Sequence, residues 1–126
     1  MGPSNPKRIL VIEDDHDIRS CLVEILEWEG YLVQTASNGQ EGLDVLGKLE
    51  KTDLPDLILL DLMMPIKDGY QFREEQVAIE KLKLIPVVVM SADGNIGDKK
   101  NRARAKEYVR KPVDLDEILA VVARNL

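Results

Sequence analysis

The chain has 126 residues, of which 44% are hydrophobic and 32% charged, and its formal net charge is −6. This length and composition are typical of one soluble globular domain and exclude an intrinsically disordered chain. The negative charge argues against contact with nucleic acid or with an anionic membrane, because both partners require a basic surface.

The cysteine content and the N-terminus add further expectations. Cys21 is the only cysteine, so no intrachain disulfide can form and the chain fits a reducing, cytoplasmic environment. No apolar stretch approaches the ~18–20 residues of a membrane span, and the N-terminus lacks the apolar core of a signal peptide. Residues 1–6 are turn-rich, which predicts a disordered lead-in or a cloning remnant before a single domain at residues 7–126.

Apolar and amphipathic segments alternate along the rest of the chain. Residues 8–12 form a short apolar run that is typical of a buried strand. Residues 17–29 repeat apolar side chains at helical spacing, and Gly30 follows as a stop signal. Residues 31–36 are rich in strand-forming residues, and residues 40–50 return to helical spacing.

The middle of the chain predicts a strand and a weaker helix. Residues 56–60 are the second strongly apolar run, and Asp61 follows directly. An ionisable side chain at the end of a buried strand is held rigidly and loses part of its water, which favours a nucleophile or a metal ligand there. Residues 69–83 predict the third helix, although Gln76 interrupts its apolar face.

The last third of the chain predicts two strands and a well-formed helix. Residues 86–90 form an apolar strand, and residues 108–109 lie in a short final strand. The pattern at residues 114–126 is that of an amphipathic helix, which Asp114 begins as the N-cap.

The order of these elements predicts an α/β fold. Apolar runs without polar alternation indicate strands that are buried on both faces, and the helices between them imply parallel pairing through right-handed crossovers. The sequence therefore predicts an open, doubly wound, five-stranded parallel sheet with flanking helices. In such sheets a ligand binds outside the carboxyl ends of the strands. Functional side chains should therefore directly follow the strands.

Charged and polar side chains follow four of the predicted strands. In chain order they are Glu13, Asp14, Asp15, Asp61, Ser91 and Lys111. Several acids in a partly desolvated cleft repel one another, and a divalent cation relieves this repulsion. Oxygen ligands without a cysteine–histidine cluster favour Mg²⁺ over zinc. Such a cation and Lys111 leave room beside Asp61 for a phosphoryl group, which a carboxylate can attack to give an acyl phosphate.

In this order and at these strand ends, the motifs resemble the receiver domain of two-component response regulators, the CheY-like family, over residues 7–126. The resemblance implies a flavodoxin-like fold and a phosphorelay function in signal transduction. A histidine kinase or a phosphotransfer protein would phosphorylate Asp61 with Mg²⁺ as the cofactor, and the modification would switch a partner-binding surface. Such a module is not a metabolic enzyme, because it catalyses only its own phosphotransfer and autodephosphorylation.

The resemblance also implies a role for each matching residue. Asp61 would be the phospho-acceptor, and Lys111 would bind the phosphoryl group and precede Pro112 in a cis peptide bond. Ser91 would be the switch hydroxyl, and Tyr108 the aromatic side chain that changes its packing. The implied metal ligands are Glu13, Asp14, Asp61 and the backbone carbonyl of Met63.

The register of the three consecutive acids stays open. Arg19, five positions after Asp14, matches the start of the family's first helix and favours Glu13 with Asp14 as the acidic pair. In that register Asp15 is a neighbouring, more exposed acid. In the other, Asp15 and not Glu13 is the second acid of the metal site.

Three features depart from the family pattern, all of them away from the phosphorylation site. Residues 93–102 contain two glycines and two asparagines, which predicts a short or mobile fourth helix. Arg73 and Gln76 stand where the third helix usually carries apolar residues. Arg104 stands where the family often has glycine, and we expect the turn there to differ because arginine avoids positive φ.

Two other functions are alternatives. A phosphate-independent, receiver-like interaction domain is favoured by the atypical segment 93–102, whereas four intact residues argue against it: Asp14, Asp61, Ser91 and Lys111. A haloacid-dehalogenase-type phosphatase also uses a strand-end aspartate, but it requires a second aspartate two residues on, where this chain has Met63. The sequence leaves the output partner open, and a phosphorylation-dependent homodimer is one option. No contact of this domain with nucleic acid or membrane is expected.

Overall fold

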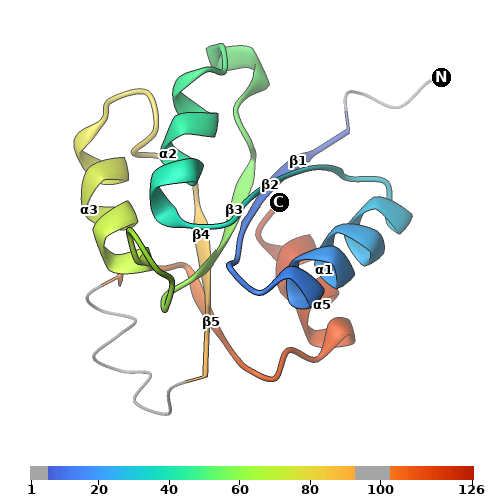
Figure 1. The fold of residues 1–126 in the computed structure, drawn as a ribbon. Helices are drawn as coiled ribbons and strands as arrows, with labels where there is room; N and C mark the ends of the chain where they lie inside the picture. Colours follow the sequence, from blue (N-terminus) through green and yellow to red (C-terminus); the bar gives the residue numbers. More distant parts are fainter. Residues whose placement is uncertain (1–5, 93–102) are drawn as a thin grey trace, which may run out of the picture.

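The computed structural model describes residues 6–92 and 103–126. Residues 1–5 of the expected lead-in and residues 93–102 of the expected fourth helix lie outside the described part of the chain. The arrangement of the described elements can be followed in Figure 1.

Five parallel strands form one sheet in the order β2-β1-β3-β4-β5. In chain order they are β1 (Arg8–Ile12), β2 (Leu32–Ala36), β3 (Leu57–Asp61), β4 (Val87–Ser91) and β5 (Glu107–Arg110). The chain winds outward from β1 to β2, returns across β1 to β3, and continues to β5. This double winding confirms the predicted fold class, and it places the switch in strand order between β1 and β3.

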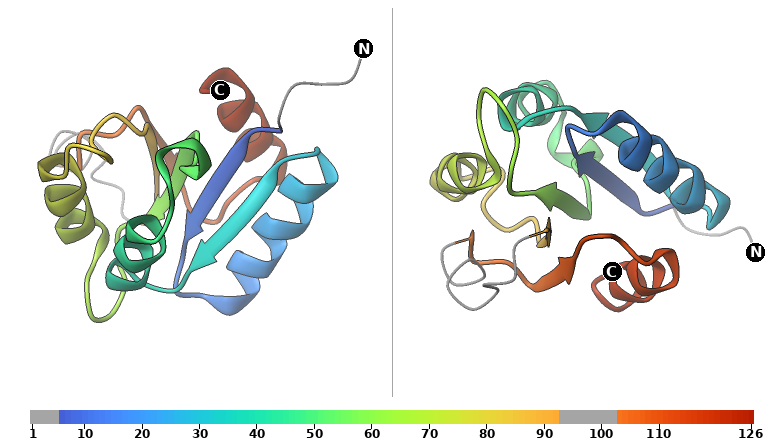
Figure 2. Two further views of the ribbon diagram at one scale, coloured as in Figure 1. Left: turned by 90° about the horizontal axis from the view of Figure 1, so that it is seen from above. Right: turned by 60° about the horizontal axis from the view of Figure 1, so that its bottom comes forward.

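Helices cover both faces of the sheet (Figures 1 and 2). In the described part of the chain they are α1 (His16–Trp28), α2 (Gly39–Gly47), α3 (Gly69–Ala78) and α5 (Leu115–Arg124), with a short 3₁₀ helix at Lys51–Asp53. Helices α1 and α5 pack on one face, and α2 and α3 pack on the other. None of the described helices combines the length and the apolar content needed to cross a bilayer.

Side chains of the central strands alternate between two hydrophobic cores. In β1, Leu10 and Ile12 join the core beneath α2 and α3, whereas Ile9 and Val11 join the core beneath α1 and α5. Every residue of β3 is buried. Burial on both faces is the reason why these strands are continuous apolar runs in the sequence.

Helix α3 is shorter than the sequence predicted, because it ends at Ala78 and not near residue 83. Ile79 is extended (φ −99°, ψ 116°) and begins a series of turns. These turns carry Leu82 and Ile85 into the core beneath α2 and α3. Apolar spacing alone does not distinguish a helix from compact turns that bury the same residues.

The expectation that Arg104 would avoid a positive φ was wrong. Arg104 adopts φ 55°, in the left-handed region that costs residues with a side chain ~1–2 kcal/mol. Its carbonyl oxygen accepts a hydrogen bond of 2.8 Å from Nη2 of Arg73. A tertiary contact therefore outweighs the local preference that the sequence reports.

Gly69, the first residue of α3, lies against the chain that leaves β3. Its amide donates to the carbonyl oxygen of Leu62 (3.0 Å). A Cβ atom at this position would lie 2.6 Å from the carbonyl oxygen of Asp61 and 2.8 Å from Cα of Leu62. Both are backbone atoms, so no side-chain rotation would relieve the contact, and the close approach of α3 to the end of β3 requires glycine.

We expect Gly69→Ala to lower the free energy of unfolding by about 1–3 kcal/mol, because the new methyl group forces α3 away from the backbone of β3. Gly47→Ala is the matched control, since a Cβ there meets nothing within 4 Å. Gly47 closes α2, so its replacement should be neutral or stabilising by less than ~1 kcal/mol. Urea unfolding followed by circular dichroism measures both, and equal effects would contradict the close approach.

Candidate functional site

A cavity of about 240 Å³ opens at the carboxyl edge of the sheet, beside the switch in strand order. Its lining residues are Glu13, Asp14, Asp15, Ile18, Asp61, Met63, Ala92 and Lys111. They come from the last residue of β3 and from the segments that follow β1, β3, β4 and β5. Parallel strands bring these segments together at one edge, although they are far apart in the sequence.

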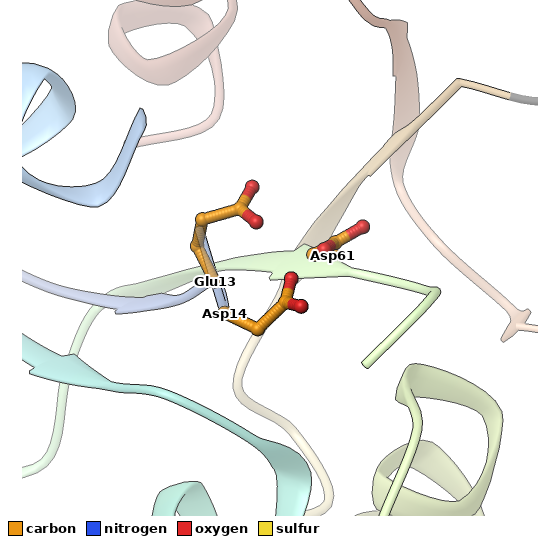
Figure 3. Close-up of side chains that lie close together, drawn as sticks. All are labelled: Glu13, Asp14 and Asp61. Carbon is orange, nitrogen blue, oxygen red and sulfur yellow. The ribbon is translucent and has the colours of Figure 1, made fainter. Parts of the chain in front are cut away.

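Three carboxylates converge in this cavity (Figure 3). Glu13, Asp14 and Asp61 each offer one oxygen atom, and these oxygens lie within 4.8 Å of one another. Glu13 is fully buried and Asp61 is 3% exposed, whereas Asp14 is exposed. Three oxygen ligands at this spacing, one of them open to solvent, fit a hard divalent cation that keeps part of its water shell.

Lys111 supplies the positive charge beside the acids. Its Nζ lies 2.7 Å from Oε1 of Glu13 and 3.3 Å from Oδ2 of Asp61. Burial alone would lower the pKa of Lys111, but its interactions with Glu13 and Asp61 outweigh burial, and the pKa is raised. The ammonium group therefore stays charged and bridges the two buried carboxylates. The Lys111–Pro112 peptide bond that follows is cis, as the resemblance implied.

Asp61 is poorly compensated despite this lysine. Burial, and then the neighbouring carboxylate of Glu13, raise the pKa of Asp61 from 3.8 to about 8, while Lys111 acts in the opposite direction. Two buried acids face one ammonium group, so one negative charge has no counterpart among the described side chains of this cluster. A cation in the cavity would supply that counterpart.

The local structure separates the roles of the consecutive acids. Asp15 is the N-cap of α1, and its side chain accepts a hydrogen bond from the amide of Ile18 (2.9 Å). Glu13 points inward and accepts from the amide of Asp15 (3.1 Å) while it faces Lys111. Asp15 lines the cavity, but Glu13 and Asp14 are the two that cluster with Asp61.

The other residues singled out in the sequence lie around the cavity at different depths. Ser91 is fully buried at the end of β4, and its carbonyl oxygen accepts from the amide of Lys111 (2.9 Å). Met63 is 64% exposed, and its amide donates to Oδ1 of Asp61 (3.3 Å). Tyr108 lies in β5, half-buried, and among the described residues its hydroxyl has no hydrogen-bond partner.

Two further residues shape the site in ways the sequence did not indicate. Nη1 of Arg19 donates to the carbonyl oxygen of Glu13 (2.8 Å) and so fixes the backbone that presents the acids. Ile66, in the loop after Asp61, has φ 69° although it is β-branched and 82% exposed. The amide of Lys67 donates to the carbonyl oxygen of Pro65 (2.7 Å) across it. A strained turn therefore follows Asp61, and nothing in an isoleucine signals it.

Comparison with known proteins finds relatives of this chain. The model of the family described as "Response regulator receiver domain" matches residues 9–123. Sporulation initiation phosphotransferase F of Bacillus subtilis is 33% identical over 122 residues, which cover 95% of this chain and 94% of that protein. The DNA-binding dual master transcriptional regulator RpaA of Synechocystis is 39% identical over 117 residues, 91% of this chain and 47% of that protein. The chain thus spans about half the length of some curated relatives that it matches.

A solved structure supports the fold. The receiver domain of the sensor histidine kinase PA1611 from Pseudomonas aeruginosa, with a magnesium ion coordinated in its active site cleft, has a TM-score of 0.83. The alignment covers 95% of this chain and 97% of that one, at 24% identity. A likeness at this identity concerns the arrangement of strands and helices.

The raised pKa of Asp61 gives the metal-free protein a specific dependence of stability on pH. Between about pH 4 and pH 8 the folded protein binds more protons at Asp61 than the unfolded chain does, so stability falls as pH rises through this range. Asp61→Asn removes the effect. In EDTA, we expect the stability advantage of the variant over the wild type to be roughly 3 kcal/mol larger at pH 8 than at pH 5, since one pKa unit corresponds to ~1.4 kcal/mol.

Urea titrations at both pH values measure this difference. Asp44→Asn is the control, because Asp44 is an exposed carboxylate on α2. Its effect should be small and equal at the two pH values. An equally pH-independent effect of Asp61→Asn would contradict the raised pKa.

Proposed function

The chain belongs to the response regulator receiver domain family and accepts a phosphoryl group in two-component signal transduction, and we propose that Asp61 is the residue that accepts it. The observation that carries this proposal is the position of Asp61. It ends β3, is 3% exposed, and lies 3.3 Å from the ammonium group of Lys111. No other aspartate of the described residues combines a strand end with burial and a facing lysine.

The metal site of this proposal consists of Glu13, Asp14 and Asp61, with the backbone carbonyl of Met63 as a further ligand. The uncompensated charge of the buried acids and the convergence of their oxygens within 4.8 Å support it. Mg²⁺ is the cation we propose, because the ligands are oxygen atoms and one acid is open to solvent. When bound, it would neutralise charge that develops on the phosphoryl oxygens.

The chemistry of the chain's own residues follows from their positions. Asp61 must first lose its proton, which the ammonium group of Lys111 favours. One carboxylate oxygen then attacks phosphorus, the phosphorus–nitrogen bond of the donor's phosphohistidine breaks, and an acyl phosphate forms on Asp61. Lys111 pairs with a phosphoryl oxygen in place of Asp61 and remains anchored to Glu13, from which it is 2.7 Å away.

Ser91 and Tyr108 are the residues we propose to report the modification. Ser91 lies on β4 next to Asp61, since Asp61 pairs with Met90 in the sheet. Its hydroxyl would donate to the phosphoryl group. Tyr108 lies one strand farther, with a buried hydroxyl that has no partner among the described residues. An unsatisfied buried hydroxyl costs free energy and destabilises the present packing of Tyr108. We therefore propose that Tyr108 changes its packing when Ser91 moves.

The partners follow from the family. A receiver domain of this kind takes its phosphoryl group from a histidine kinase. We further propose that a phosphotransfer protein can substitute for the kinase, that the domain autodephosphorylates without acting on other substrates, and that it works in the cytoplasm. In this proposal the receiver unit comprises residues 7–126, and its switched surface binds an output protein or a second copy of the chain. A phosphate-independent interaction domain is not favoured, because the acceptor, the lysine and the acids all converge.

Incubation with acetyl phosphate and Mg²⁺ tests the acceptor. We expect intact mass spectrometry to show one added phosphoryl group on the wild type and none on Asp61→Asn, because acylation requires this carboxylate. EDTA should abolish the adduct on the wild type. Asp44→Asn, which removes an exposed carboxylate, should retain it. An unchanged adduct on Asp61→Asn would assign the acceptor elsewhere.

The role of Lys111 is tested by the rate of the same reaction. We expect Lys111→Ala to slow adduct formation by roughly 10²-fold, because one preorganised positive group facing the transferred phosphoryl group is lost. Lys106→Ala is the control, since Lys106 is an exposed lysine that directly precedes β5, whereas Lys111 directly follows it. A rate for Lys111→Ala within twofold of the control would exclude direct contact with the phosphoryl group.

A further inference from the structure

Helix α3 buries two polar side chains in a position where an amphipathic helix carries apolar residues. Arg73 is 8% exposed and Gln76 is fully buried. Burial, and then the like charge of Arg104, lower the pKa of Arg73, so the guanidinium group is held here against its preference for water. Such a group persists in a protein interior only if its N–H donors are satisfied.

Two backbone carbonyls and one side-chain amide oxygen accept hydrogen bonds from three N–H donors of this guanidinium group. Nε of Arg73 donates to the carbonyl oxygen of Ala103 (2.7 Å), and Nη2 donates to that of Arg104 (2.8 Å). Nη1 donates to Oε1 of Gln76 (2.7 Å). The amide nitrogen of Gln76 in turn donates to the carbonyl oxygens of Leu82 (3.0 Å) and Ile85 (3.1 Å). We call these two side chains and their carbonyl partners the Arg73 network.

The Arg73 network lies at the end of the sheet opposite to the phosphorylation site. Ile85 precedes β4 and Arg104 precedes β5, so the network ties the amino ends of both strands to α3. The carboxyl ends of the same strands carry Ser91 and lead to Lys111, whose amide donates to the carbonyl oxygen of Ser91 (2.9 Å). Strand β5 is therefore held at both ends, with Tyr108 between them.

The position of β5 in the sheet makes this attachment consequential. Among the described strands it lies at the edge of the sheet and pairs with β4. The amide of Lys106 also donates to the carbonyl oxygen of Val87 (2.8 Å), and Glu107 pairs with Arg124 of α5 and accepts a hydrogen bond from the side chain of Asn125. The ion pair is partly exposed, whereas Arg73 and Gln76 are buried. The Arg73 network also holds Arg104 at φ 55°, a conformation that arginine adopts only under constraint.

We propose that Arg73, oriented by Gln76, anchors the amino end of β5 to α3, so that a displacement at the carboxyl end of the strand is taken up at Tyr108 and does not move the whole strand. Arg73 is then a positioning residue for the switch, 31 residues away in sequence from the turn it holds. The inference rests on the proposed function, in which a phosphoryl group on Asp61 attracts the side chains of Ser91 and Lys111. An unanchored strand would slide, and Tyr108 would lose its dependence on phosphorylation.

The test compares Arg73→Met with the wild type, both with and without acetyl phosphate and Mg²⁺. Methionine keeps the apolar stem and removes the donors. Amide hydrogen exchange of residues 103–107 in the unmodified protein should become at least tenfold faster in the variant. The change in the Tyr108 ring signal on phosphorylation, followed by NMR and assigned with Tyr108→Phe, should fall at least fivefold. The extent of phosphorylation, read by intact mass, should stay unchanged.

Lys81→Met is the matched control, because Nζ of Lys81, in the turns after α3, also donates to a backbone carbonyl, that of Leu49 (2.7 Å) in the segment after α2. It should leave both the exchange of residues 103–107 and the Tyr108 response at wild-type values. If Arg73→Met does not fold, Arg73→Lys, which keeps one donor group, should fold and show a partial loss of the response. A general packing role would lower stability in these variants and leave the Tyr108 response of the folded protein intact.

The outcomes separate this inference from the proposed function. An adduct on the variant with a full Tyr108 response, or unchanged exchange of residues 103–107, overturns the anchor and leaves Asp61 as the acceptor. No adduct on the wild type overturns both the proposed acceptor and the signalling role of the anchor.

Discussion

Two carboxylates buried beside one ammonium group determine how the rest of this site behaves. Glu13 and Asp61 are withdrawn from water, and Lys111 lies within 2.7 Å of one and 3.3 Å of the other. A single lysine cannot neutralise both, and the raised pKa of Asp61 is the direct expression of that imbalance. The free energy of the site is therefore least favourable when both carboxylates are ionised and no cation is bound. A divalent cation beside these carboxylates would supply the missing positive charge.

The fold holds this cluster of charged side chains in place at the edge of the sheet. Strands β1 and β3 are neighbours and are buried on both faces, so they hold the segments that carry Glu13, Asp14 and Asp61 with little freedom. The switch in strand order leaves the helices diverging above these segments, which opens the cavity. Gly69 lets α3 begin directly against the backbone of Asp61 and Leu62. The sheet thus holds the acidic residues rigidly, and the lack of a side chain at Gly69 lets α3 lie close to the end of β3.

Much of this could be predicted from the sequence because the signals are strong and local. Continuous apolar runs indicated strands buried on both faces, and the polar residues after them indicated the edge where the site lies. The end of α3 could not be predicted, because Leu82 and Ile85 are buried by turns that bring apolar residues to the core as a helix would. Which of three consecutive acids points inward also depends on geometry. The side chain of Asp15 is engaged by the first turn of α1, whereas that of Glu13 reaches Lys111.

The residues that looked anomalous one by one in the sequence form one structural unit. Arg73, Gln76 and Arg104 each depart from an apolar or glycine position, and propensity treats each as unfavourable. The fold joins them, because the donors of Arg73 satisfy the carbonyl group of a turn that arginine would otherwise avoid. The two polar clusters of the β4–β5 pair therefore differ in kind. At the carboxyl edge of the sheet the buried carboxylates of Glu13 and Asp61 outnumber the ammonium group of Lys111, whereas at the amino ends of β4 and β5 the Arg73 network is held by hydrogen bonds to backbone carbonyls. This contrast is the structural basis of the proposal that the amino end of β5 is anchored while its carboxyl end responds to phosphorylation.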